Sequence, residues 1–251
     1  MGIVFQAENL VKDYKLSGDK EDERVVHVLR GLNFQIEENE FVGFMGKSGC
    51  GKTTLLKILG LIEDCTGGKI YFEDDPVSDL PEMQMAAIRR QRIGFVFQDY
   101  YLVNSLSVEE NIVLPMLLNK AKALDCLKRA RYFERILGIQ SLAKKRPYVL
   151  SGGEKQRVAI CRALINNPNV ILADEPTGNL DSKASEILIT LFENIHQNLG
   201  KTIVMVSHDP QIASHCSRVI FLKDGLVMND LKRGGSKEDF YKEILNQMKD
   251  L

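Results

Sequence analysis

The chain has 251 residues, of which 44% are hydrophobic and 27% are charged, and its formal net charge is −1 at pH 7. This length is enough for a large buried core, and the composition is that of an ordinary globular protein. The balanced charge provides no overall positive field, so we expect no nucleic-acid partner.

Membrane and disulfide signals are both weak. No segment reaches the roughly 18 consecutive apolar residues of a membrane span, and the N-terminal residues lack the pattern of a signal peptide. The five cysteines form no CxxC pair, which favours free thiols in a reducing cytoplasm. We therefore expect any membrane association to be peripheral, at the cytoplasmic face.

The N-terminal segment, residues 3–36, has the character of β-structure. Val25–Leu29 and Leu32–Ile36 are predicted strands, and the polar stretch Ser17–Arg24 is a predicted loop between strands. An antiparallel β portion is the expected result.

A different pattern begins at Phe41–Met45, a short apolar run that is followed by a glycine-rich loop and a predicted helix, Thr53–Ile62. Similar apolar runs recur later, with helical patterns between them. Such runs are typical of parallel strands that are covered on both faces, so the alternation predicts an α/β core with a parallel sheet. The later runs are Ile93–Phe97, Val170–Ala173 and Ile203–Val206, and the helical patterns are Glu154–Ile165 and Lys183–Leu199.

Residues 108–142 carry helical patterns throughout, without a β run. We interpret them as a helical lobe inserted into the α/β core. Towards the C-terminus we expect a strand over Arg218–Leu222, a turn at Lys223–Gly225 and an amphipathic helix over Lys237–Met248.

The glycine-rich loop matches G-x-x-x-x-G-K-T, with a strand before it and a helix after it. Its glycines let backbone N–H groups converge on phosphate oxygens, and the helix N-terminus favours an anion. Lys52 is expected to reach the β- and γ-phosphates, and the Thr53 hydroxyl to bind Mg²⁺. A glycine-rich turn that only caps a helix is the alternative. The expected nucleotide-binding residues here are Gly46, Lys47, Ser48, Gly49, Cys50, Gly51, Lys52, Thr53 and Thr54.

Two carboxylates, Asp174 and Glu175, follow the apolar run Val170–Ala173. Ligands of open α/β sheets bind at the carboxyl ends of strands. We expect Asp174 to hold Mg²⁺ through water and Glu175 to orient or deprotonate the attacking water. Alone, Asp-Glu before Pro176 would be only a turn, but downstream of a phosphate loop the functional interpretation is favoured.

Three further side chains are candidates. Gln98 ends a predicted strand, and its amide is expected to contact Mg²⁺ and the attacking water; a solvated glutamine is the alternative. His208 is expected at the γ-phosphate, although it could merely precede a helix that Asp209 caps and Pro210 begins. Tyr14 is a candidate for stacking on adenine, with simple packing as the alternative.

A second anion-binding element lies at Leu150–Glu154. Ser151 and Glu154 have capping-box spacing, while Gly152 and Gly153 leave first-turn N–H groups uncovered. The element has no lysine and no candidate Mg²⁺ ligand. It is either simply a capped helix or a site for a phosphate whose other contacts come from elsewhere.

The ordered set of these motifs, ending with Asn179–Asp181 and His208, resembles the ATP-binding cassette (ABC) ATPases over nearly the whole chain. The resemblance implies one P-loop NTPase domain over residues 1–251, with a RecA-like parallel core, an antiparallel β subdomain and a helical subdomain over about 99–150. It also implies ATP and Mg²⁺ as cofactors and a head-to-tail dimer. In that dimer Ser151 and Gly153 of one copy would contact the γ-phosphate held by Lys52 of the other, and Asp181 would lie at the seam. Glu154, where glutamine is commoner, is a mild departure.

Several segments resemble the lipoprotein-release and macrolide-export group of ABC transporters, among them Ile93–Gln98, Leu106–Ile112 and Asp174–Asp181. The tail, from Arg218 to Ile244, is similar to ATPases of bacitracin-type peptide-resistance transporters. That likeness implies a membrane permease as partner, docked on the helical lobe through Tyr100, Tyr101 and Leu102, and a sensor kinase reached through the permease. Burial of these three residues within the lobe is the alternative. A non-transport ATPase that switches a scaffold or a cell-division complex remains the second functional hypothesis.

Overall fold

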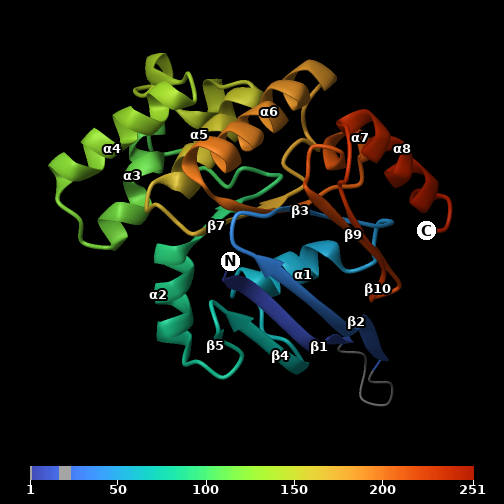
Figure 1. The fold of residues 1–251 in the computed structure, drawn as a ribbon. Coiled ribbons are helices and arrows are strands. Elements are labelled where there is room, and N and C mark those ends of the chain that lie inside the picture. Colours follow the sequence, from blue (N-terminus) through green and yellow to red (C-terminus); the bar gives the residue numbers. More distant parts are fainter. Residues whose placement is uncertain (1, 17–23) are drawn as a thin grey trace. The chain divides into compact units, whose positions relative to one another are not determined.

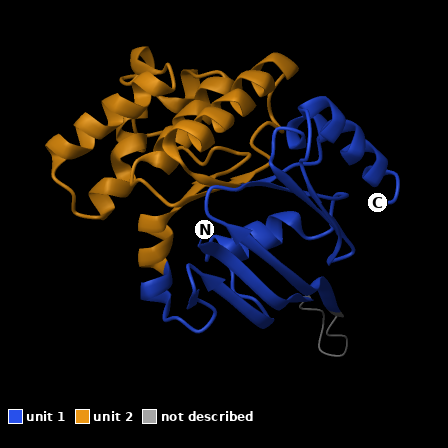
Figure 2. Ribbon diagram, viewed as in Figure 1, with its two compact units in different colours: residues 1–85, 204–251 blue, residues 86–203 orange. Residues whose placement is uncertain are grey.

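The computed structural model describes residues 2–16 and 24–251, and these form two compact units (Figure 2). Unit 1 consists of residues 1–85 and 204–251, and unit 2 of residues 86–203. Helix α2 (Glu82–Arg92) and strand β8 (Thr202–Val206) contain the two points at which the chain passes between the units. The loop expected at Ser17–Arg24 falls almost entirely outside the described residues.

Unit 1 contains the predicted antiparallel sheet, with strands in the order β2-β1-β4-β5 (Figure 1). The two strands expected at 25–29 and 32–36 are a single long strand, because Gly31 continues the chain with a positive φ of 100° instead of ending it. The four strands are β1 (Ile3–Leu16), β2 (Arg24–Glu37), β4 (Gly67–Phe72) and β5 (Asp75–Pro76).

The rest of unit 1 is α/β. Strand β3 (Phe41–Met45), buried along its whole length, pairs in parallel with β9 (Arg218–Lys223), which pairs antiparallel with β10 (Leu226–Lys232). Helix α1 (Lys52–Leu59) follows β3 and ends at Gly60, earlier than predicted. The short helix α7 (Pro210–Ala213) begins after its Asp209 cap, and the C-terminal helix α8 (Lys237–Met248) has its predicted bounds. Strand β10 was not predicted.

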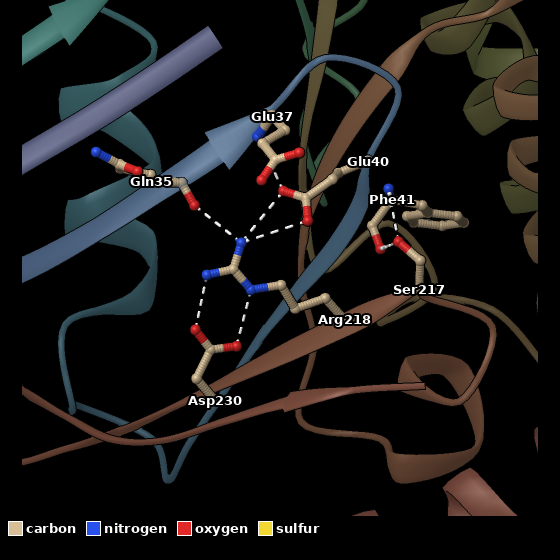
Figure 3. Close-up of polar contacts among 7 residues, drawn as sticks. All are labelled: Gln35, Glu37, Glu40, Phe41, Ser217, Arg218 and Asp230. Atoms are coloured by element: carbon tan, nitrogen blue, oxygen red, sulfur yellow. Dashed lines mark hydrogen bonds and ion pairs between the residues drawn. The ribbon is translucent and has the colours of Figure 1, made fainter. Parts of the chain in front are cut away.

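A buried ion cluster connects three strands of unit 1 (Figure 3). The guanidinium of Arg218 donates from Nε and Nη2 to the carboxylate of Asp230, at 2.8 and 2.7 Å. Its Nη1 donates to the carbonyl of Gln35 at 2.9 Å and lies 3.2 Å from Glu40. Hydrogen bonding to Asp230 raises the pKa of Arg218. The cluster connects β9 to β10, to β2 and to Glu40, the residue before β3, which is the strand that leads into the glycine-rich loop.

Unit 2 combines two parallel strands with several helices. Strand β6 (Ile93–Val96) pairs in parallel with β7 (Val170–Asp174). The expected helical segment is present as α3 (Val108–Leu118), α4 (Ala123–Ile136) and the 3₁₀ turn η1 (Gln140–Leu142). A second 3₁₀ turn, η2 (Pro147–Val149), precedes α5 (Gly152–Leu164), and α6 (Ser182–Leu199) follows β7.

The five cysteines are free, as expected, and four of them are buried. Within residues 2–16 and 24–251, no helix has both the length and the apolar character needed to cross a membrane.

Candidate nucleotide site

The glycine-rich loop of unit 1 connects β3 to α1, the strand–loop–helix order that the motif requires. Gly49 and Gly51 have φ of 83° and 102°, which a residue with a Cβ rarely adopts. Gly51 is the N-cap of α1 and has no side chain to cover the first N–H groups of the helix. The loop therefore presents open backbone donors at a helix N-terminus, an arrangement that suits a phosphate group.

Lys52 is buried beneath the loop. Its Nζ donates to the carbonyls of Gly46 and Lys47, at 2.8 and 2.9 Å, and lies 4.0 Å from the Sγ of Cys50. Its positive charge is thus held against the carbonyl groups of the loop. Burial raises the pKa of the Cys50 thiol, so this cysteine is a neutral side chain that fills space under the loop.

The aromatic ring of Tyr14 lies next to the same helix. Its hydroxyl donates a short hydrogen bond to the carboxylate of Glu63 and also interacts with the Thr54 hydroxyl in the first turn of α1. The ring is half-buried. The structure thus places the Tyr14 hydroxyl beside the first turn of α1, at Thr54.

His208 also belongs to unit 1. It follows β8, is exposed, and precedes the Asp209 cap of α7 as expected. The backbone N–H of the adjacent Ser207 donates to the carbonyl of Phe44 in β3 at 3.1 Å. This bond places His208 near the end of the strand that enters the phosphate loop.

In unit 2, Gln98, Asp174 and Glu175 come together at the carboxyl ends of β6 and β7, where Val96 pairs with Ala173. Asn179 ties the two chain segments together, because its Nδ2 donates to the Gln98 carbonyl at 3.1 Å and its Oδ1 accepts from Gln98 Nε2 at 3.5 Å. Glu175 has a positive φ of 41°, an uncommon conformation for a glutamate.

The second anion-binding element is a complete capping box. The Ser151 hydroxyl accepts from the Glu154 N–H at 3.3 Å, and a Glu154 carboxylate oxygen accepts from the Ser151 N–H at 2.8 Å. This hydrogen bond lowers the pKa of Glu154. Asp181 is the N-cap of α6, and its carboxylate accepts from the Ala184 N–H at 2.8 Å.

The two capped helices of unit 2 begin side by side. A Cβ added to Gly153 would lie 3.7 Å from Ala184 in the first turn of α6, and one added to Gly152 would lie 3.1 Å from Leu180. The N-termini of α5 and α6 thus form one surface that contains Ser151, Gly153 and Asp181.

The chain matches the ABC transporter family over residues 29–178. The chain belongs to the ABC transporter family. Bacitracin export ATP-binding protein BceA of Halalkalibacterium halodurans is 40% identical over 243 residues, covering 96% of this chain and 94% of that protein. ABC transporter ATP-binding protein YxdL of Bacillus subtilis is 43% identical over 246 residues, covering 98% and 93%.

A solved structure of the ABC cassette MJ0796 of Methanocaldococcus jannaschii, a dimer bound to ADP and Pi, superposes with a TM-score of 0.84. The two sequences are 39% identical, and the match covers 92% of this chain and 100% of the MJ0796 chain. These similarities confirm the predicted ABC fold, with its antiparallel β portion, and the prediction of an ABC-type ATPase. The protein is the ATP-binding subunit of an ABC transporter.

The expected Mg²⁺ ligands of the ABC subunit are Thr53, Gln98 and Asp174. Among the described residues, no group of three or more His, Cys, Asp or Glu side chains gathers as a metal site. A hydroxyl, an amide oxygen and one carboxylate nevertheless suit Mg²⁺, a hard cation that retains several waters and needs few protein ligands. Thr53 lies in unit 1 and the other two residues lie in unit 2, and each side chain has an oxygen of the kind that Mg²⁺ takes.

Three contacts of the ABC subunit escape sequence reasoning. Glu63 binds Tyr14 across 49 positions of the chain, and Asn179 binds Gln98 across 81. Arg162 in α5 donates to the carbonyls of Tyr100 and Tyr101, at 2.6 and 2.5 Å, where both residues have positive φ. No spacing in the sequence indicates such pairs. Correlated substitutions among homologues are the kind of information that could have revealed them.

Proposed function

We propose that two copies of this chain sandwich ATP head to tail, so that each site combines the phosphate loop of one copy with the Ser151–Glu154 turn of the other. The proposal rests on a difference between the two anion-binding elements in the groups that each offers to a phosphate. The phosphate loop has a buried lysine, whereas the capping-box turn offers N–H groups and a hydroxyl only. The dimeric MJ0796 cassette provides a precedent in a relative.

Within such a site the roles follow from chemistry. Lys52 and the loop N–H groups bind the β- and γ-phosphates, and Ser151 and Gly153 of the second copy complete the γ-phosphate shell. Thr53, Gln98 and Asp174 would hold Mg²⁺, which would neutralise charge on the phosphates when bound. Glu175 accepts the proton of the attacking water, and His208 donates to the γ-phosphate.

The variant Glu175→Gln tests this assignment. It should bind ATP as the wild type does, lose turnover, and accumulate as a dimer with ATP in size-exclusion chromatography. Glu186→Gln on the exposed part of α6 is the control and should retain turnover. Normal hydrolysis by Glu175→Gln would remove the residue from its role.

We further propose that the transporter served by this subunit gives resistance to antimicrobial peptides. The resemblance of the tail to the bacitracin-type group and the similarity to a bacitracin export protein support this substrate class. The expected partner is a membrane permease, with a sensor kinase beside it, and the chain would then work at the cytoplasmic face of the membrane.

The docking surface that we propose is a groove of about 310 Å³ in unit 2, lined by Phe95, Phe97, Tyr101 and Arg162 among others. Tyr101 packs edge-on against Phe97, with ring centroids 4.8 Å apart, yet it remains 63% exposed. Complete burial of Tyr101 within the lobe is therefore wrong, whereas Tyr100 and Leu102 are half-buried.

Tyr101→Ala should weaken permease-stimulated hydrolysis more than ATP binding, because the exposed ring is lost while the phosphate loop is untouched. The assay compares ATPase activity with and without the co-purified permease, in parallel with peptide resistance of cells. Normal stimulation and normal resistance would contradict the docking proposal.

A further inference from the structure

Tyr14 is held by a network that the proposed hydrolysis chemistry does not use. Its hydroxyl donates to one oxygen of the Glu63 carboxylate, and Lys57 Nζ lies 3.1 Å from the other oxygen. Lys12 Nζ lies 5.0 Å from the centre of the Tyr14 ring and 3.9 Å from the Glu63 carboxylate, and donates to the Asp64 carbonyl at 2.6 Å. All of these groups belong to unit 1.

The network joins two different elements. Tyr14 and Lys12 project from β1, whereas Lys57 lies in the last turn of α1, the helix whose first turn belongs to the phosphate loop. After α1 ends, Leu61 adopts a positive φ of 54°. The backbone N–H groups of Ile62 and Glu63 both donate to the Lys57 carbonyl. This turn directs Glu63 back between the helix and the strand.

The charges in the network support each other. Burial alone would raise the pKa of Glu63, but hydrogen bonds from Tyr14 and Lys57 outweigh it and lower that pKa. Burial and the Glu63 hydrogen bond both raise the pKa of Tyr14. At neutral pH a protonated phenol therefore donates to an ionised carboxylate, which is the stronger, charge-assisted kind of hydrogen bond.

We propose that Glu63 is a positioning residue for the nucleotide, because it fixes the Tyr14 ring relative to the helix of the phosphate loop. A nucleotide must place its base and its phosphates in two subsites at once. A ring that is free to rotate would have to be ordered on binding, at a cost in affinity, whereas a ring already held by Glu63 requires less ordering. The inference rests on the proposed stacking of adenine on Tyr14.

The test compares two ligands that share the phosphate subsite, MgATP and inorganic tripolyphosphate. Their dissociation constants are measured by isothermal titration with the wild type, Glu63→Ala and Tyr14→Phe. Each variant should bind ATP about three- to tenfold more weakly, a fraction of what a full charge-assisted hydrogen bond contributes. Binding of tripolyphosphate, which has no base, should be unchanged.

Further variants sharpen the result. The double variant should be no weaker than either single variant, since both changes remove the same hydrogen bond. Glu63→Gln keeps an acceptor for Tyr14 and should restore part of the affinity. Glu8→Ala is a matched control, because Glu8 also accepts from a tyrosine, Tyr71, on the same sheet but away from the loop. In steady-state assays Glu63→Ala should raise KM for ATP and leave kcat unchanged.

Two results would overturn the inference: wild-type ATP affinity in Glu63→Ala, or an equal loss of tripolyphosphate affinity, which would mean that Glu63 only supports the loop. Tyr14→Ala separates this failure from that of the proposed stacking. If Tyr14→Ala binds ATP as tightly as the wild type, the stacking role itself is wrong. If only Tyr14→Ala loses affinity, the Glu63 inference alone fails.

Discussion

The buried cluster around Arg218 yields a stability prediction that can be worked from its contacts (Figure 3). In Arg218→Met, Asp230 loses two charge-assisted hydrogen bonds, Gln35 loses the donor to its carbonyl, and Glu40 loses its cation. Removing one partner of a buried ion pair costs about 3–5 kcal/mol. The Asp230 side chain is 38% exposed and can regain water, so we expect a loss of about 3 kcal/mol, the lower end of that range.

The assay is urea denaturation followed by circular dichroism, since the chain contains no tryptophan. Lys242→Met is the matched control in the same unit, because the Lys242–Asp239 pair is 3.8 Å long and exposed on both sides. That variant should unfold at the wild-type urea concentration. A loss below about 1 kcal/mol in Arg218→Met, the range of a surface pair, would refute the idea that this cluster stabilises the connection of β9 to β10, β2 and Glu40.

Two further changes test the phosphate loop and the helical lobe. Gly46→Ala should lower the free energy of unfolding by about 2 kcal/mol, because the new Cβ would lie 2.3 Å from the Leu222 carbonyl oxygen; Gly234→Ala, with open space around it, should cost nothing, and equal stabilities in denaturation would contradict the prediction. Burial, followed by the charge of Glu109, raises the pKa of Glu134, so the wild type should lose stability as the pH rises above about 4.5, the unperturbed value, through the higher folded pKa. Glu134→Gln should therefore gain stability over the wild type as the pH rises from about 4.5 through the folded-state pKa of Glu134, and a difference that stays constant with pH would show that Glu134 does not titrate in this way.

The local parts of the site could be predicted from the sequence because each depends on residues a few positions apart. The phosphate loop needs Gly49 and Gly51 at positive φ, and the capping box needs Ser151 and Glu154 at its two ends. In such short segments the spacing of the residues determines the local structure through backbone geometry alone. The same reasoning predicted the α8 helix with its correct bounds.

The remaining features depend on contacts between distant segments, which spacing does not encode. The hydrogen bond between Tyr14 and Glu63 forms because β1 pairs with β4, and Glu63 lies in the segment that connects α1 to β4. Strand β10 was missed because its residues alternate poorly and it forms only by pairing with β9. The sequence predicts two strands where β2 is continuous, because the irregular pairing with β1 that the positive φ of Gly31 accompanies depends on a distant segment.

The shared site is the central claim, and complementation between two inactive variants tests it most directly. Lys52→Ala removes the cation of the phosphate loop, and Gly153→Asp puts a negative charge at the capping-box turn. In a 1:1 mixture half of the dimers carry one change in each copy, and in each of these dimers one of the two sites is intact. The mixture should therefore recover up to about a quarter of wild-type ATPase activity, if dimers form head to tail and at random. A mixture as inactive as the separate variants, or turnover by either variant alone, would contradict the account.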